Sequence, residues 1–287
     1  LLSRRQRQMC IRDSDYIKGV FSGDGKIFKL SNTENINARW RGRAFAELDT
    51  EEKRRIRNTT IHAIIFEQKH PRNDTGMFQI FERINTGGRT LKAQEIRNCV
   101  YQGKCNDLLF ELNKRNSWRR ILGLDVEDSR MADLELILRY FAMRDLHIRN
   151  EGQLKQINLA KYLNQYMSDK TRTTEEDILN MKQDFIQMID KVFELFGKTA
   201  FKNLKKESEN FASRINPAIF DAISVATSYA IKTGVEFTQE DYLEKYKSLL
   251  KNEEFLRASS SRTTNIDNIK IRIQLAAKSL YGVTYEW

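Results

Sequence analysis

The sequence contains little proline and little cysteine, and each scarcity excludes a class of protein. Among 287 residues there are two prolines, Pro71 and Pro217, so long stretches contain no helix-breaking residue. This predicts a mainly helical chain. The three cysteines, Cys10, Cys99 and Cys105, form no even framework of disulfides and indicate a reducing, cytoplasmic location. They also provide too few ligands for a zinc site.

Long apolar runs and clustered histidines are also missing. No stretch approaches the roughly 20 apolar residues of a membrane span, and the N-terminus lacks the apolar segment of a signal peptide. We therefore expect no membrane partner. The three histidines, His62, His70 and His147, have no metal-ligand spacing, and no G-x-x-x-x-G-K-[ST] motif occurs. The sequence therefore predicts no metal site and shows no nuclease chemistry of its own.

Positive charge is in excess, with 49 lysines and arginines against 39 acidic residues and a net charge of +10. Such a chain is attracted to polyanions, and to nucleic acid above all. Arginines interleaved with tryptophan, as around Trp40 and Trp118, can hold a phosphate backbone and stack on bases. Solvated faces show the same pattern. The candidate DNA contacts are Arg41, Arg43, Arg54, Arg119, Arg120, Arg262 and Arg272.

The N-terminal segment 1–14, LLSRRQRQMCIRDS, has an unusual character. Its residues 8–14 resemble the translation of a sequencing adapter, so the segment is left out of the fold prediction. We expect that natural sequence upstream of about residue 15 is missing. The segment carries four arginines against one aspartate, and the remaining chain stays basic without it. A genuine basic arm is the alternative interpretation.

The rest of the chain divides into two parts by its pattern of apolar residues. Residues 15–145 are predicted to form a small α+β front part, and residues 146–287 a helical part, with a polar seam at 145–156. The strand candidates, KIFKL at 26–30 and TTIHAIIF at 59–66, both lie in the front part. We therefore expect an α+β, mostly α-helical fold.

Several helix ends can be read directly from residue types. Asp49 or Thr50 is expected to cap a short helix that has acids first and bases last. Thr174 and Asp177 resemble a capping box, and apolar residues follow at helical spacing to residue 196. Pro217 is expected to open a nearly all-apolar, buried helix.

The most informative stretch is residues 78–101, FQIFERINTGGRTLKAQEIRNCVY. Gly87–Gly88 permits positive φ angles, so successive N–H groups can face one side, beside Arg83 and the start of the next helix. Such a nest suits an anion. Asn85 and Glu95 could orient a ribose, a base or a hydrated metal. The alternative is a glycine stop between two helices that binds nothing.

Residues 81–103, FERINTGGRTLKAQEIRNCVYQG, resemble the F-x-x-(I/L)-N-T-G-G-x-x-L-x-x-x-E-(I/L)-R-N-A signature of the GmrSD restriction endonuclease N-terminal domain family. Cys99 stands where that family usually has alanine. Looser resemblance is found at residues 134–145, 216–227 and 252–280. The resemblance therefore covers about residues 15–287.

This resemblance implies a ParB/sulfiredoxin-like front part, incomplete here, and a nucleotide-binding or nucleotide-hydrolysing role in a prokaryotic restriction system against foreign or modified DNA. It implies a nucleoside triphosphate with a divalent cation as cofactor. DNA and a His-Asn-His type nuclease are the implied partners. The family's D-G-Q-Q-R motif does not occur in this sequence, so we expect a truncated copy that is inactive alone.

The resemblance also supplies candidate site residues, although the signature does not separate ligand contacts from residues that hold the fold. No catalytic residue is assigned. The residues carried over as nucleotide- or phosphate-binding are Glu82, Arg83, Asn85, Thr86, Gly87, Gly88, Glu95, Arg97 and Asn98.

A second phosphate-binding candidate lies at residues 257–272, where hydroxyls and bases precede a helix. The alternative there is a solvated loop with ordinary N-cap residues. Two other functions also stay open for the whole chain. The first alternative is a non-catalytic DNA-binding module. The second is a scaffold whose apolar helices dock a nuclease, and the sequence does not rank the two.

Overall fold

The structure is a computed structural model. It describes residues 16–19, 27–34, 36–60, 76–84, 91–124, 126–146, 154–170, 173–205, 208–238 and 241–287. Within the helix at 76–84, the side chains at positions 77, 81, 82 and 84 lie outside the description. The chain divides into two compact units, residues 1–69 and residues 70–287, and each is described by itself.

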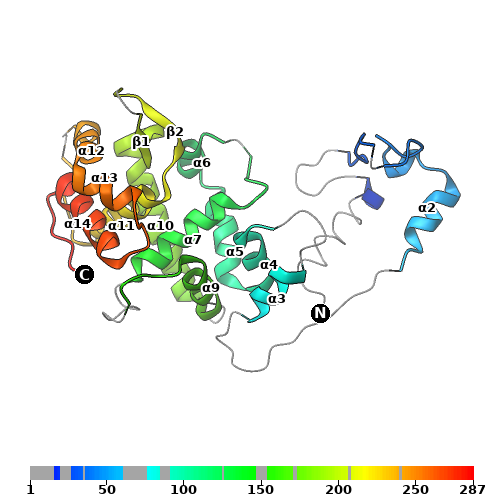
Figure 1. The fold of residues 1–287 in the computed structure, drawn as a ribbon, viewed down its shortest axis with the longest axis horizontal. Helices are drawn as coiled ribbons and strands as arrows, with labels where there is room; N and C mark the ends of the chain where they lie inside the picture. Colours follow the sequence, from blue (N-terminus) through cyan, green and yellow to red (C-terminus); the bar gives the residue numbers. More distant parts are fainter. Residues whose placement is uncertain are drawn as a thin grey trace. The chain divides into compact units, whose positions relative to one another are not determined.

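Helices make up most of the described chain, which confirms the expectation of a mostly α-helical fold with a small β component (Figure 1). The elements are η1 (Phe45–Glu47), α2 (Thr50–Arg57), α3 (Gly76–Ile84), α4 (Ala93–Val100), α5 (Lys104–Asn113), α6 (Asn116–Leu122), α7 (Ala132–Arg144), α9 (Leu159–Asp169), α10 (Glu175–Phe196), η4 (Gly197–Thr199), β1 (Lys202–Leu204), β2 (Phe211–Ile215), α11 (Pro217–Lys232), α12 (Tyr242–Lys251), α13 (Glu253–Ser260) and α14 (Ile266–Tyr281).

The described part of the first unit is held by a small apolar cluster and one short helix. Tyr16, Phe45 and Leu48 form the cluster, with ring centroids of Tyr16 and Phe45 5.7 Å apart. Helix α2 begins where the sequence predicted, because the Asp49 carboxylate accepts the backbone N–H of Glu52 at 2.8 Å. The described part of the predicted strand at 26–30 forms isolated bridges and no extended strand, and one of these bridges joins Lys29 and Ala44.

The second unit has one large core that is built around aromatic side chains. Trp118 of α6 is fully buried, and its ring centroid lies 6.3 Å from that of Phe185 and 5.7 Å from that of Phe220. The indole N–H donates to the Asn113 side-chain oxygen at 3.0 Å. This hydrogen bond satisfies the polar end of a side chain that is otherwise surrounded by apolar atoms.

Helices α10 and α11 form the centre of this core, as their sequences predicted. Thr174 caps α10 because its hydroxyl accepts the backbone N–H of Asp177 at 3.1 Å. The Asp177 carboxylate in turn accepts the backbone N–H of Thr174. Pro217 is the first residue of α11, whose N-cap Asn216 accepts the N–H of Ala218 at 2.8 Å. Both predicted helix starts are confirmed.

The sheet of the described chain lies where no strand was predicted. Strands β1 and β2 form an antiparallel pair, with Lys202 opposite Ile215 and Leu204 opposite Phe211. Strands this short carry too little alternation to stand out from the helical pattern around them. The hairpin is instead supported by a residue distant in the sequence, because the Tyr246 hydroxyl donates to the Lys202 carbonyl at 2.8 Å. Most of the other strand candidate, at 59–66, lies outside the described residues.

The division between the units also differs from the predicted seam at 145–156. Helices from both sides of that seam share the core of the second unit, and the rings of Phe141 and Phe185 lie 6.1 Å apart. The Tyr162 hydroxyl also donates to the Ala142 carbonyl at 2.8 Å. A drop in hydrophobicity marked a connection inside one core, and it did not mark a boundary between domains.

A buried ionic cluster joins three helices of this core. Asp221 of α11 is fully buried, and both its carboxylate oxygens accept bonds from Arg139 of α7, at 3.1 and 2.6 Å. Arg272 of α14 donates to the same carboxylate at 3.0 Å, and it is 1% exposed. Burial lowers the pKa of Arg272, while the charge of Asp221 opposes that effect.

None of the helices within the described ranges combines the length and the apolar character that crossing a membrane requires.

We expect Asp221→Asn to lower the free energy of unfolding by about 3–5 kcal/mol, because it removes the carboxylate charge that the buried Arg272 and the largely buried Arg139 share. Urea unfolding followed by circular dichroism measures this change. Glu175→Gln is the matched control, because Glu175 pairs with Lys104 at an exposed site, and its midpoint should barely move. Equal midpoints for the two variants would contradict a central role for Asp221.

Candidate functional site

The signature at 81–103 spans α3 and α4, which pack against each other in the second unit (Figure 1). Of the residues carried over from the resemblance, Asn85, Thr86, Gly87 and Gly88 lie outside the described residues, as does the side chain of Glu82. Arg83 is exposed on α3. The remaining three, Glu95, Arg97 and Asn98, all belong to α4.

Arg97 is buried and bonded to two other helices, α7 and α9. It is 1% exposed, and its Nε donates to the Asn164 side-chain oxygen on α9 at 2.7 Å. One Nη donates to the Glu135 carboxylate on α7 at 2.9 Å. Burial lowers the pKa of Arg97, and the charge of Glu135 raises it again in part. This guanidinium therefore holds α4 against α7 and α9.

Asn98 and its neighbours fasten α4 to α5. The Asn98 side-chain oxygen accepts a bond from the Asn106 amide at 2.9 Å, and both residues are buried. The adjacent Cys99 and Cys105 are free thiols, and burial raises the pKa of Cys105 to about 11. At neutral pH that thiol is protonated and packs as a small apolar group. These residues therefore serve the packing of two helices.

Glu95 fixes the start of α4. Its carboxylate accepts the backbone N–H of Lys92 at 2.7 Å and also pairs with Arg130 Nε at 3.1 Å. The first contact caps the helix, and the second connects it to the loop before α7. A metal ion would have to compete with both contacts for this carboxylate.

Gln94, the second residue of α4, was not singled out by the sequence. It is 2% exposed, and its side-chain oxygen accepts a bond from Arg97 Nη1 at 3.1 Å. Its amide nitrogen has no hydrogen-bond partner among the described residues. An unsatisfied buried donor costs about 1–3 kcal/mol. It is therefore a point at which an oxygen atom of a ligand or a water would be stabilised.

These contacts give α4 a fixed position, and the helix begins at Ala93, with four residues between it and the N-T-G-G motif. Sequence reasoning missed the partners that fix it, namely Gln94, Arg130, Glu135 and Asn164. Three of these four, Arg130, Glu135 and Asn164, are more than 30 residues from the α4 side chain that they contact, so no local spacing reveals them. We assign no nucleophile and no catalytic base to α4.

The second candidate region, at 257–272, forms a pocket of about 450 Å³ at the start of α14. Two basic side chains, Arg257 and Arg262, lie on its wall with Ile271, and Asp267 reduces the local positive charge. The other lining residues are Ser261, Asn265 and Asn268. This volume falls within the roughly 300–1,000 Å³ of small-molecule sites.

The loop behind this pocket is held by side chains of α14. Asn268 Nδ2 donates to the carbonyls of Ser261 and Arg262, at 3.0 and 3.2 Å. Arg272 Nη1 donates to the Thr263 carbonyl at 2.6 Å. Arg262 has a φ of 47°, in the region that favours glycine, and its side chain is exposed. The inward-facing contacts hold the loop in this conformation.

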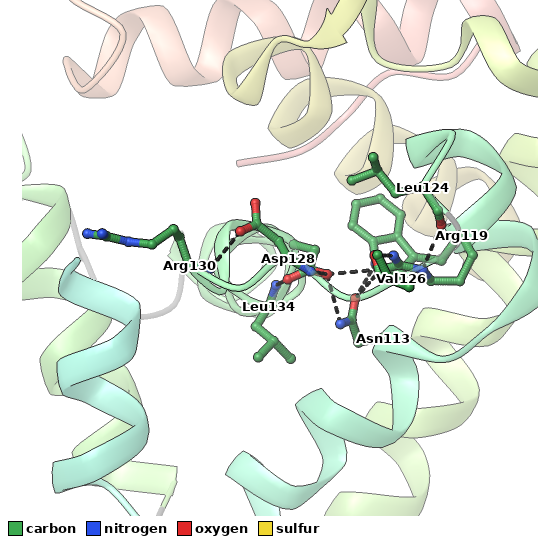
Figure 2. Close-up of polar contacts among 9 residues, drawn as sticks. Asn113, Arg119, Leu124, Val126, Asp128, Arg130 and Leu134 are labelled. Carbon is green, nitrogen blue, oxygen red and sulfur yellow. Dashed lines mark hydrogen bonds and ion pairs between the residues drawn. The ribbon is translucent and has the colours of Figure 1, made fainter. Parts of the chain in front are cut away.

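The candidate DNA contacts have very different surroundings. Arg272 is buried on Asp221, so it does not belong with the surface arginines, and the sequence could not show this because its partner is 51 residues away. Arg119 is engaged by Asp133 and by loop carbonyls (Figure 2). Arg41 donates to the Ile36 carbonyl at 2.6 Å. The exposed members are Arg43, Arg54, Arg120 and Arg262.

The described residues give little support for a metal site. His62, His70 and His147 all lie outside the described residues. Among the residues that are described, no group of three or more His, Cys, Asp or Glu side chains is placed to hold a metal ion.

Similarity to known proteins adds no assignment. Neither a protein-family model, nor a curated protein, nor a solved structure matches the chain. The roles proposed below therefore rest on the contacts described above and on the sequence resemblance at 81–103.

We expect Arg97→Ala to destabilise the chain by about 3 kcal/mol, because it removes several buried hydrogen bonds and leaves Glu135 without its partner. Arg83→Ala is the matched control from the same signature, and its exposed site predicts a change within about 0.5 kcal/mol. Urea unfolding of both variants measures the difference. If Arg97→Ala were as stable as the parent chain, the contacts of Arg97 would not be holding α4 in place.

Proposed function

We propose that this chain is a nucleotide-binding component of a prokaryotic restriction system that acts against foreign or modified DNA. The resemblance at 81–103 supports the nucleotide and the system. The observation that carries the proposal is the unpartnered amide of Gln94, buried in the first turn of the helix that follows the N-T-G-G motif.

The chemistry of this region favours an oxygen-rich anion. Backbone N–H groups at a helix start and an amide donor both suit phosphate or ribose oxygens. Their positions depend on α4, which Arg97 and Glu95 hold on the rest of the unit. Because Glu95 is already engaged, a divalent cation would arrive coordinated to the phosphates of the nucleotide and not through α4.

We propose nucleotide binding for this chain, and hydrolysis is a separate step. The D-G-Q-Q-R motif that the resemblance connects with the nucleotide site does not occur in the sequence. Binding therefore provides the direct test, because it requires only the donors and the geometry of the α3–α4 region.

We expect the chain to bind at least one Mg²⁺–nucleoside triphosphate, and Asn85→Ala and Gln94→Met to weaken that binding about tenfold each, the value of one good hydrogen bond. Titration calorimetry with each of the four ribonucleoside triphosphates measures this. Gln187→Met, at an exposed position on α10, is the matched control.

Two results would refute the proposal. The first is the absence of binding for all four nucleotides at millimolar concentration by a chain that is folded by circular dichroism. The second is unchanged affinity in both Asn85→Ala and Gln94→Met, which would place the nucleotide elsewhere.

A second function, binding to duplex DNA, is favoured by the pocket at the start of α14. Arg257 and Arg262 present two guanidinium groups on its wall, and Arg262 is exposed. Guanidinium groups bind phosphate oxygens through two parallel N–H bonds. The net charge of +10 would strengthen attraction to a polyanion at long range.

We expect duplex affinity to fall steeply with salt, because each phosphate contact releases counterions. Arg262→Gln should lower the slope of log affinity against log salt by about 0.9, the value of one contact. Fluorescence anisotropy with a labelled duplex measures the slope. Lys104→Gln, the same charge change at an exposed site on α5, should leave the slope nearly unchanged. An identical slope in Arg262→Gln would remove this pocket from the DNA surface.

A further inference from the structure

The loop between α6 and α7 exposes two apolar side chains. Leu124 is 45% exposed and Val126 is 74% exposed, the highest value among the large apolar side chains in the described part of the chain. The neighbouring Glu127 is exposed as well. Burying apolar surface is favourable, so these side chains would gain from a partner.

Arg119 holds this loop by its backbone. Its Nε donates to the Leu124 carbonyl at 3.2 Å, and one Nη donates to the Val126 carbonyl (Figure 2). The other Nη donates to the Asp133 carboxylate at 2.9 Å. The side chains of Leu124 and Val126 are exposed, while their backbone carbonyls are bonded to Arg119.

Asp133, buried at the start of α7, is the centre of the network. Its Oδ2 accepts bonds from Asn113 Nδ2 at 2.9 Å and from the backbone N–H of Asp128 at 3.0 Å. Asp128 Oδ1 in turn accepts the N–H of Arg130 at 2.6 Å. The carbonyls of Leu124 and Val126 and the N–H groups of Asp128 and Arg130 are thus all hydrogen-bonded (Figure 2). Docking that uses residues already bonded to the rest of the protein loses little conformational entropy.

The chemistry of the loop determines the surface that it fits. Leu124 and Val126 require an apolar contact, and Glu127 with Asp128 requires positive charge around it. The protein as a whole carries +10, so an acidic loop differs from its general surface. The complementary surface is a basic pocket with an apolar side chain in its wall.

The chain itself carries such a surface in the pocket at the start of α14. Arg257 and Arg262 supply positive charge that exceeds the single negative charge of Asp267, and Ile271 supplies the apolar contact. None of the residues lining that pocket belongs to the loop at 123–131. Figure 1 shows α13 and α14 at one side of the second unit and the α6–α7 loop at the other. A contact between the two surfaces therefore requires two molecules.

We propose that the α6–α7 loop of one copy of this chain docks into the α13–α14 pocket of a second copy. The two surfaces differ, so the contact is head-to-tail, and repetition would build short open chains or a ring. An interface made by one loop is small, so we expect a dissociation constant on the order of 10⁻⁴ M. This inference does not depend on the proposed nucleotide site.

Sedimentation velocity of the full chain without nucleotide or DNA, over a concentration series that passes 10⁻⁴ M, tests the proposal. We expect concentration-dependent association that the double variant Leu124→Ser/Val126→Ser weakens about tenfold. Leu179→Ser is the matched control, because Leu179 is 53% exposed on α10 and lies outside both surfaces. Circular dichroism confirms that each variant is folded.

A charge exchange tests the pairing of the two surfaces. Arg262→Glu and Glu127→Arg should each weaken association, and a mixture of the two variants should associate more strongly than either alone. A chain that stays monomeric at every concentration would overturn the proposal. Association that is unchanged in the Leu124→Ser/Val126→Ser variant, or a mixture no stronger than the single variants, would overturn it too.

Discussion

The buried carboxylate of Asp221 is the contact on which the arrangement of the second unit depends. It holds Arg139 of α7 and Arg272 of α14, and Arg272 in turn holds the carbonyl of Thr263 in the pocket loop. On the other side, Glu135 lies close enough to raise the pKa of Arg139 and also pairs with Arg97. A series of ion pairs and hydrogen bonds, joined between Glu135 and Arg139 by electrostatic attraction alone, therefore connects α4 with the start of α14.

The buried charges also restrict the movement of the two candidate binding regions. Charges that are buried and paired in this way are costly to break, so the helices that carry them keep fixed positions. The two regions with unsatisfied or exposed donors, the first turn of α4 and the pocket of α14, lie at the two ends of the series. Both are therefore held by the same core, and each could present its donors with little reorganisation on binding.

Local signals in the sequence predicted helix starts well, and they predicted long-range contacts poorly. Asp49, Thr174 and Pro217 mark helix starts because a cap acts within three residues of its own position. Arg272 looked like a surface arginine, and only its distant partner Asp221 shows that it is buried. The β1–β2 hairpin was missed for the same reason, because its support comes from Tyr246.

The same distinction separates the residues of the signature. Glu95, Arg97 and Asn98 each have a partner inside the fold, so their identity is explained by the position of α4. Such residues recur in a motif because a helix must be placed accurately before its first turn can bind anything. In the proposed nucleotide site, recognition would fall to groups whose donors are free, and Gln94 is such a group on α4. A motif can thus identify a binding region mainly through the residues that build it.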